Sequence, residues 1–222
     1  MHHRYSPTHL IVSLLLLIAL VTLLQIGLVS LAFGRLGLSQ QSAMLLLFAS
    51  LFGSAINVPV LRVSAQAPPG EPVVPRLRGL LRLPTLPFTG TTLIAVNLGG
   101  CLIPLTFSLY LITHTGVALY AVVGVILLTA FVAYVFSRPI HGLGIGLPPF
   151  IAPVVAAASA MLLQADQSPP LAYIGGTLGV IIGADLLRVR DIRRMGTPVA
   201  SIGGAGTFDG IFISGLIAVL LA

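Results

Sequence analysis

The stretch GVALYAVVGVILLTAFVAYVFS, residues 116–137, decides the fold class. It has no charged residue and is long enough to cross a bilayer as a helix, which takes about 20 apolar residues. Six similar runs surround it: Leu10–Phe33, Gln40–Leu61, Thr89–Thr113, Leu147–Leu163, Pro170–Leu187 and Ala200–Leu221. With Gly116–Ser137 they predict an all-α, polytopic transmembrane helix bundle of about seven spans, in which residues 1–222 form a single integral membrane domain.

The composition supports this class. The chain is 57% hydrophobic and 7% charged, with a mean hydropathy of +1.09, more apolar surface than a soluble domain of this length could bury. The net charge of +6 comes from eleven basic residues, all arginines. Such an excess is typical of cytoplasmic loops in membrane proteins and argues against a nucleic-acid partner. Cys101 is the single cysteine, which excludes an internal disulfide.

The arginines also orient the chain. With seven spans, ten of the eleven fall on one side of the membrane and only Arg35 falls on the other. Short cytoplasmic loops carry the excess of basic residues, so the N-terminus is expected inside and the C-terminus outside, in a multi-pass protein of the cell (inner) membrane. The first span follows Arg4 but is too long for a signal-peptide core, and we expect it to be retained.

One long connection stands out between the spans. Residues 62–88 are rich in proline and carry four arginines. We expect this cytoplasmic loop to lie irregularly at the lipid surface, where anionic head groups attract basic residues. The lipid bilayer is therefore the one partner that the sequence itself indicates.

Two aspartates, Asp185 and Asp209, lie inside the last two predicted spans of a chain with only five acidic residues. A carboxylate in hydrocarbon is costly and is by default a candidate functional group. Asn57 and Asp185 would lie at the cytoplasmic ends of their spans, whereas Asn97 and Asp209 would lie roughly 12–15 Å deep if those segments are helical. The sequence predicts one cytoplasm-facing polar site that binds an ion or a proton through Asp209, Asn97, Asp185 and Asn57.

The two aspartates are not equivalent. Asp185 is close in sequence to Arg188 and Arg190, so an interfacial ion pair would explain it. Asp209 follows the glycine-rich stretch Gly203–Gly206, where a broken helix could expose backbone groups beside the carboxylate. Asp209, with Asn97 as its expected neighbour, is thus the sharper candidate.

Glycine and proline mark further breaks. Asn97 precedes Gly99, Gly100 and Pro104, where close helix packing through small residues is an equal alternative to a broken helix. A parallel internal repeat, helices 1–3 beside helices 5–7, would pair Asn57 with Asp185 and Asn97 with Asp209. His141 lies in a Gly/Pro-rich segment before the fifth span, and a single histidine is weak support for a metal. The sequence assigns no cofactor and leaves any metal open.

Several motifs resemble a known family. They are GSAINVP (53–59), AVNLGG (95–100) with Ile103-Pro104, LPP (147–149), AYIGGTLG (172–179) with GADL (183–186), and SIGGAGTFDGIF (201–212). This combination is similar to the uncharacterised membrane family called domain of unknown function 1614, over most of the chain from the second span onward. The resemblance implies no activity, substrate or catalytic residue.

Three functions fit these residues. The first is ion- or proton-coupled transport, because hard cations prefer the oxygen ligands that the four polar residues supply. The second is an intramembrane aspartyl protease with Asp185 and Asp209 as catalytic pair, although no Pro-Ala-Leu motif follows and the residues before each aspartate depart from the presenilin pattern. The third is a non-catalytic accessory or scaffold subunit, working with other protein subunits or as a homo-oligomer. We expect the first.

Overall fold

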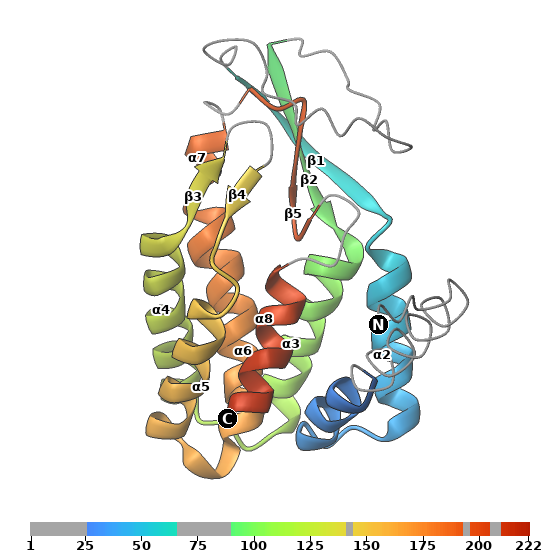
Figure 1. The fold of residues 1–222 in the computed structure, drawn as a ribbon, viewed down its shortest axis with the longest axis vertical. Coiled ribbons are helices and arrows are strands. Elements are labelled where there is room, and N and C mark those ends of the chain that lie inside the picture. The colour runs from blue at the N-terminus through green and yellow to red at the C-terminus, as the bar shows by residue number, and fades with distance from the viewer. Residues whose placement is uncertain (1–25, 66–89, 141–143, 193–195, 205–209) are drawn as a thin grey trace, which may run out of the picture.

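The computed structural model describes residues 26–65, 90–140, 144–192, 196–204 and 210–222. The helices lie side by side in one bundle, and the strands lie together at one end of it (Figure 1). The helices are α2 (Gln40–Gly53), α3 (Ile103–His114), α4 (Leu119–Phe136), α5 (Ile151–Leu163), α6 (Ser168–Val180), α7 (Val189–Ile192) and α8 (Gly210–Leu221). Two π-helical segments, η1 (Leu98–Leu102) and η3 (Ile181–Leu186), adjoin α3 and α6, and the 3-10 turn η2 (Ala165–Gln167) precedes α6.

The helices have the length and composition of a membrane protein. Within the described residues, Leu119–Phe136 and the continuous segment Ala165–Leu186 are long and apolar enough to cross a bilayer. A third candidate is the pair Ile26–Arg35 and Gln40–Gly53, which is bent by 117° at its break. Leu98–His114, Ile151–Leu163 and Gly210–Leu221 are apolar but shorter. The chain is therefore mostly helical with two or three candidate spans.

The expectation of an all-helical bundle needs correction. Three predicted spans contain strands at one end: β1 (Asn57–Ser64), β2 (Thr91–Asn97) and β5 (Val199–Ile202). A short hairpin of β3 (Arg138–Ile140) and β4 (Gly144–Gly146) lies beside them. The physical reason is local, because Pro59 would break a helix interior and the neighbouring valines favour strands. An apolar run of this length does not by itself distinguish a strand from a helix.

The three longer strands form a mixed sheet in the order β1-β2-β5. β1 and β2 are antiparallel, with Asn57 opposite Asn97, and the register shifts between Pro59 and Leu61. β5 pairs parallel to β2, with Ser201 opposite Ala95. A small core of Val63, Ile94 and Ile192 joins the sheet to α7, so the strand end has a hydrophobic cluster separate from the main core of the bundle.

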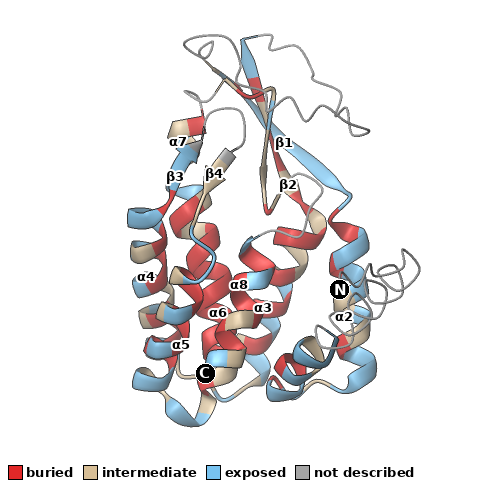
Figure 2. Cartoon of the chain, in the orientation of Figure 1, coloured by how far each residue is buried: buried red, intermediate tan, exposed pale blue. Residues whose placement is uncertain are grey.

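α6 is the central helix. Twelve of its thirteen residues are buried, and α4, α5 and α8 surround it (Figures 1 and 2). Gly175, Gly179 and Gly183 follow one face, where an added Cβ would clash with Val125, Thr129 and Ala130 of α4. On another face, Gly176 meets Ser214 and Ala218 of α8. Small residues let helix backbones approach closely where apolar solvent gives no hydrophobic driving force.

The two ends of the bundle differ in charge. At the end opposite the strands, the Arg35 guanidinium donates to the carbonyl oxygens of Val219 (2.9 Å) and Leu220 (3.3 Å) at the end of α8. The strand end carries Arg62 on β1, Arg138 on β3, and Arg188 and Arg190 beside and within α7. Arg35 is thus separated from these four arginines, as the sequence predicts.

Candidate functional site

Asn97, Asn57 and Ser201 form a hydrogen-bonded group where the sheet meets the helices, which we call the node. Asn97 is its central residue. This residue ends β2 and caps the N-terminus of η1, with its side chain fully buried. Its Nδ2 donates to the Ser54 carbonyl (2.7 Å) and to Asn57 Oδ1 (3.1 Å), while its Oδ1 accepts from the Gly100 N–H (2.7 Å). Both amide hydrogens are therefore used. A backbone acceptor on Nδ2 and a backbone donor on Oδ1 together fix which way the amide is turned.

Asn57 and Ser201 complete this node. Asn57 Oδ1 accepts from Asn97 and also lies 2.6 Å from the Ser201 Oγ, which is itself 2.7 Å from the Gly204 carbonyl. A hydroxyl has one hydrogen, so Ser201 can donate to only one of these two oxygens at a time. Asn57 and Ser201 lie nearer the surface than Asn97, and the node is open on their side.

The structure brings Asn57 and Asn97 together, as expected, but at a different place in the fold. The 12–15 Å depth expected for Asn97 was conditional on a helix from Thr89, and that condition is not met, because residues 91–97 form β2 and Asn97 lies where the helical segment begins. Ser201 was missed as a site residue. The pairing of β5 with β2 is what brings Ser201 near Asn57, and this pairing cannot be deduced while the segment is interpreted as a helix.

Glycines allow the node to close. An added Cβ on Gly99 would overlap the Ser50 carbonyl of α2, and one on Gly100 would overlap the Gly203 carbonyl after β5. Gly203 has a φ of +85°, a conformation that favours glycine. Close packing and a broken helix were alternatives for Gly99 and Gly100, and the structure has both, because the packing glycines lie inside a π-helical segment.

Asp185 lies on the other π-helical segment. It is half-buried in η3, where the Leu187 N–H donates to the Ile182 carbonyl in an i→i+5 bond (3.0 Å). π-helical segments are rare and frequently occur at functional sites. The grouping of Asp185 with Asn57 and Asn97 in one site stays a prediction from sequence.

Three other predictions cannot be placed. Asp209, His141 and residues 66–88 of the predicted loop lie outside the described residues. The proposed repeat is matched only in part: β2 followed by η1 and α3 resembles β5 followed by α8, and the two strands are parallel neighbours. Asn57 begins a strand whereas Asp185 belongs to a π-helical segment, so that pair occupies different structures.

Arg188 binds the C-terminal end of α4. Its guanidinium forms an ion pair with Asp191 (3.1 Å) and donates to the carbonyls of Tyr134 (2.8 Å) and Ser137 (2.9 Å). It also lies 4.4 Å from the centre of the Tyr134 ring. Sequence reasoning did not single out Asp191, the carboxylate that pairs with Arg188.

The chemistry of the node is neutral and hydrogen-bonding. Among the described residues there is no group of three or more His, Cys, Asp or Glu side chains that could hold a metal. Fold and node together define a mostly helical protein of membrane character whose helices join a small sheet through the buried amide of Asn97 and its partner Asn57.

Comparison with known proteins places the chain in a family. The family model described as protein of unknown function (DUF1614) matches residues 51–221, and the chain belongs to this family. No curated protein and no solved structure matches the chain.

Proposed function

We propose that this chain is a multi-pass protein of the cell (inner) membrane that carries out proton-coupled transport, with its strand end in the cytoplasm. The separation of Arg35 from the arginines of the strand end supports this orientation, because cytoplasmic segments carry the excess of basic residues. The membrane span count stays a prediction of seven.

The observation that carries the proposal is the position of Asp185. It lies half-buried at the basic end of the central helix, on a π-helical turn. A carboxylate there can take up a proton from the cytoplasmic side and carry it into the bundle. Asp209 directly precedes the first residue of α8 in sequence, and we propose it as the second titrating group.

The node favours a proton over a metal cation as the coupled ion. A cation needs several free oxygen ligands, whereas Asn97 uses both amide hydrogens and its oxygen within the protein. Asn57 Oδ1 likewise already lies within bonding distance of two donors. We therefore assign Asn57 and Asn97 to the frame of the site and proton transfer to the aspartates, which need no coordination shell.

The test is proton flux in liposomes that contain the purified protein. Asp185→Asn and Asp209→Asn should each lower the flux at least tenfold under an imposed pH gradient. Asp166→Asn is the matched control, because Asp166 is exposed in η2 at the opposite end of α6. Wild-type flux in both variants, or no flux above empty liposomes in the wild type, would refute the proposal.

A second function has one observation in its favour. β1 is an outer strand of the sheet and exposes Ile56, Val58, Val60 and Leu61 at its start and along its length, an apolar surface that an accessory or scaffold subunit would use. Co-purification of a stoichiometric partner, lost in Val60→Asp, would support this role. The aspartyl-protease interpretation stays a prediction from sequence.

A further inference from the structure

Three buried hydroxyl groups gather in the core. Of the six buried side-chain oxygens among the described residues without a hydrogen bond of standard geometry, those of Tyr173, Thr177 and Ser214 lie on α6 and α8, and the Tyr173 and Thr177 hydroxyls are close enough to interact with each other. Tyr173 and Thr177 are one turn apart on α6, and Ser214 is on α8 beside Gly215. Leaving a buried hydroxyl unpaired costs about 1–3 kcal/mol, so three in one region indicate something more than accidental packing.

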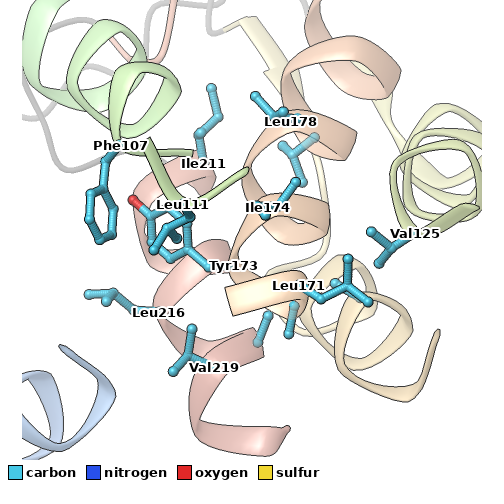
Figure 3. Packing of buried hydrophobic residues seen from close by; sticks show 14 of the residues in the cluster. Phe107, Leu111, Val125, Leu171, Tyr173, Ile174, Leu178, Ile211, Leu216 and Val219 are labelled. Carbon is cyan, nitrogen blue, oxygen red and sulfur yellow. The ribbon is translucent and has the colours of Figure 1, made fainter. Parts of the chain in front are cut away.

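The contact between α6 and α8 brings these groups together. An added Cβ on Gly215 would lie 2.6 Å from Thr177 Oγ1 and 3.1 Å from the Tyr173 ring, so glycine is what lets α8 approach this face. Figure 3 shows Tyr173 between Phe107 and Leu111 of α3 and Ile211 of α8. The groups lie roughly 12–18 Å along the segment that begins at Ala165, near the middle of its length.

The π-helical segment turns Asp185 toward the same face. At about 100° per residue, Asp185 would lie about 120° around an uninterrupted α-helix from Tyr173. One extra residue in the turn shifts the residues beyond it back by about 100°, and Asp185, inside the segment, receives part of this shift, so it moves from about 120° toward about 20° from Tyr173. Thr177 lies about 40° from Tyr173 on this scale, so this geometry places all three residues on one side of the helical segment, and the Tyr173 and Thr177 part of that side meets α8.

An apolar layer separates the two levels. Asp185 is about 12 Å further along the helix than Thr177, and Val180 and Ile181 between them are buried. A hydrophobic constriction of this kind can block water and ions until it widens. The face therefore carries a carboxylate at the basic end, an apolar barrier, and a polar group of hydroxyls at mid-depth.

We propose that Tyr173, Thr177 and Ser214 bind water in the core, and that this site receives protons from Asp185 across the barrier of Val180 and Ile181. The inference rests on the proposed proton transport and extends it. Water suits the site because its groups are neutral donors and acceptors. A Cβ added to Gly176 would lie 3.0–3.3 Å from atoms of α8, so the two helices approach closely beside these hydroxyls.

Proton transfer along this path changes only O–H bonds. Protonated Asp185 gives its proton to a water that enters the widened barrier. Each water or hydroxyl on the path accepts one proton and releases another to the next oxygen, and Asp185 is then reprotonated from the cytoplasm. One proton moves for each cycle and no other bond forms or breaks.

The test measures proton flux in liposomes and thermal unfolding of the same variants. Thr177→Val and Tyr173→Phe should lower the flux at least fivefold, and Thr177→Ser, which keeps a hydroxyl, should restore it to within twofold. Val180→Ala, which thins the barrier, should raise the flux severalfold. Ser159→Ala is the control, because the Ser159 hydroxyl is buried on α5 but already donates to the Val155 carbonyl (2.6 Å), and its flux should match the wild type.

Thermal unfolding separates this inference from the proposed function. If the hydroxyls hold water, Thr177→Val breaks paired hydrogen bonds and should lower the midpoint by about 2–4 °C; a dry, unpaired hydroxyl would instead give a higher midpoint when removed. A lowered midpoint with no wild-type flux would refute proton transport but retain the water site. A raised midpoint, or wild-type flux in Thr177→Val and Tyr173→Phe, would overturn the inference.

Discussion

Replacing Asn97 by alanine should destabilise the protein more than any other change at the node. The variant loses three hydrogen bonds: to the Ser54 carbonyl, to Asn57 Oδ1 and from the Gly100 N–H. The Ser54 carbonyl and the Gly100 N–H would then lie unpaired in a buried region, at about 1–3 kcal/mol each. With about 1 kcal/mol for the third bond, the expected loss is roughly 3–7 kcal/mol, which lowers the unfolding midpoint by at least about 6 °C.

The chain contains its own reporter for this measurement. Cys101 is the single cysteine, is 4% exposed, and lies in η1 four residues after Asn97. A dye that becomes fluorescent on reaction with thiols will report unfolding in detergent when Cys101 becomes accessible. Because the reporter lies inside the perturbed segment, circular dichroism of the helices should be recorded in parallel to separate local opening from global unfolding.

Two variants provide the comparison. Asn97→Asp keeps an oxygen to accept from Gly100 but places another oxygen against the Ser54 carbonyl, so it should lose most of the stability as well. Ser201→Ala removes one shared hydrogen bond at a partly exposed position and should shift the midpoint by less than about 3 °C. If Asn97→Ala shifts the midpoint no more than Ser201→Ala, Asn97 does not stabilise the node. Its assignment to the frame of the site, and not to ion binding, would then be refuted.

Three further predictions follow from the packing and the charges. Gly183→Leu should abolish folding or lower the midpoint by more than about 10 °C, roughly 3 kcal/mol or more, because a side chain there would overlap the Ala130 backbone. Gly116→Leu is the control and should be tolerated in the same assay, because a Cβ there has nothing within 4 Å. Arg188→Lys should destabilise nearly as much as Arg188→Met, about 2–3 kcal/mol by thermal unfolding, because one ammonium cannot reproduce the fork that contacts Tyr134, Ser137 and Asp191; full rescue by lysine would contradict this. For orientation, in a Cys101→Ala background, Arg138→Cys should react with a membrane-impermeant thiol reagent only from the cytoplasmic side and His114→Cys only from the opposite side; labelling of both from one side would exclude the topology.

The sequence predicts the helices around the centre of the chain well. Leu119–Phe136 and Ala165–Leu186 match predicted spans closely, because long uncharged runs leave few alternatives. The errors fall where an apolar run changes from helix to strand, as at Asn57–Leu61 and Thr91–Val96. Hydropathy does not change at that boundary, so it cannot locate it. Pro59 and the valines beside it do favour a strand, but the length of the apolar run favours a helix.

The candidate site was predictable in its composition more than in its geometry. Asn57 and Asn97 could be selected because amides are rare in apolar runs, and they are in contact. Their hydrogen-bond partners, mostly backbone atoms and Ser201, depend on strand register and could not be deduced. The orientation of Asp185 depends on one extra residue in a helical turn, which no periodicity analysis of an apolar helix reveals.

The parallel pairing of β2 with β5 has a consequence for biosynthesis. The two strands are about a hundred residues apart in the chain, with α3 to α7 between them, so their ladder can form only late in translation. The β1–β2 hairpin can form much earlier, which leaves one edge of β2 open to other strands while the rest of the chain is made. A stop codon before Val199 should therefore produce an aggregation-prone fragment, even though α4, α5 and α6 would all be present.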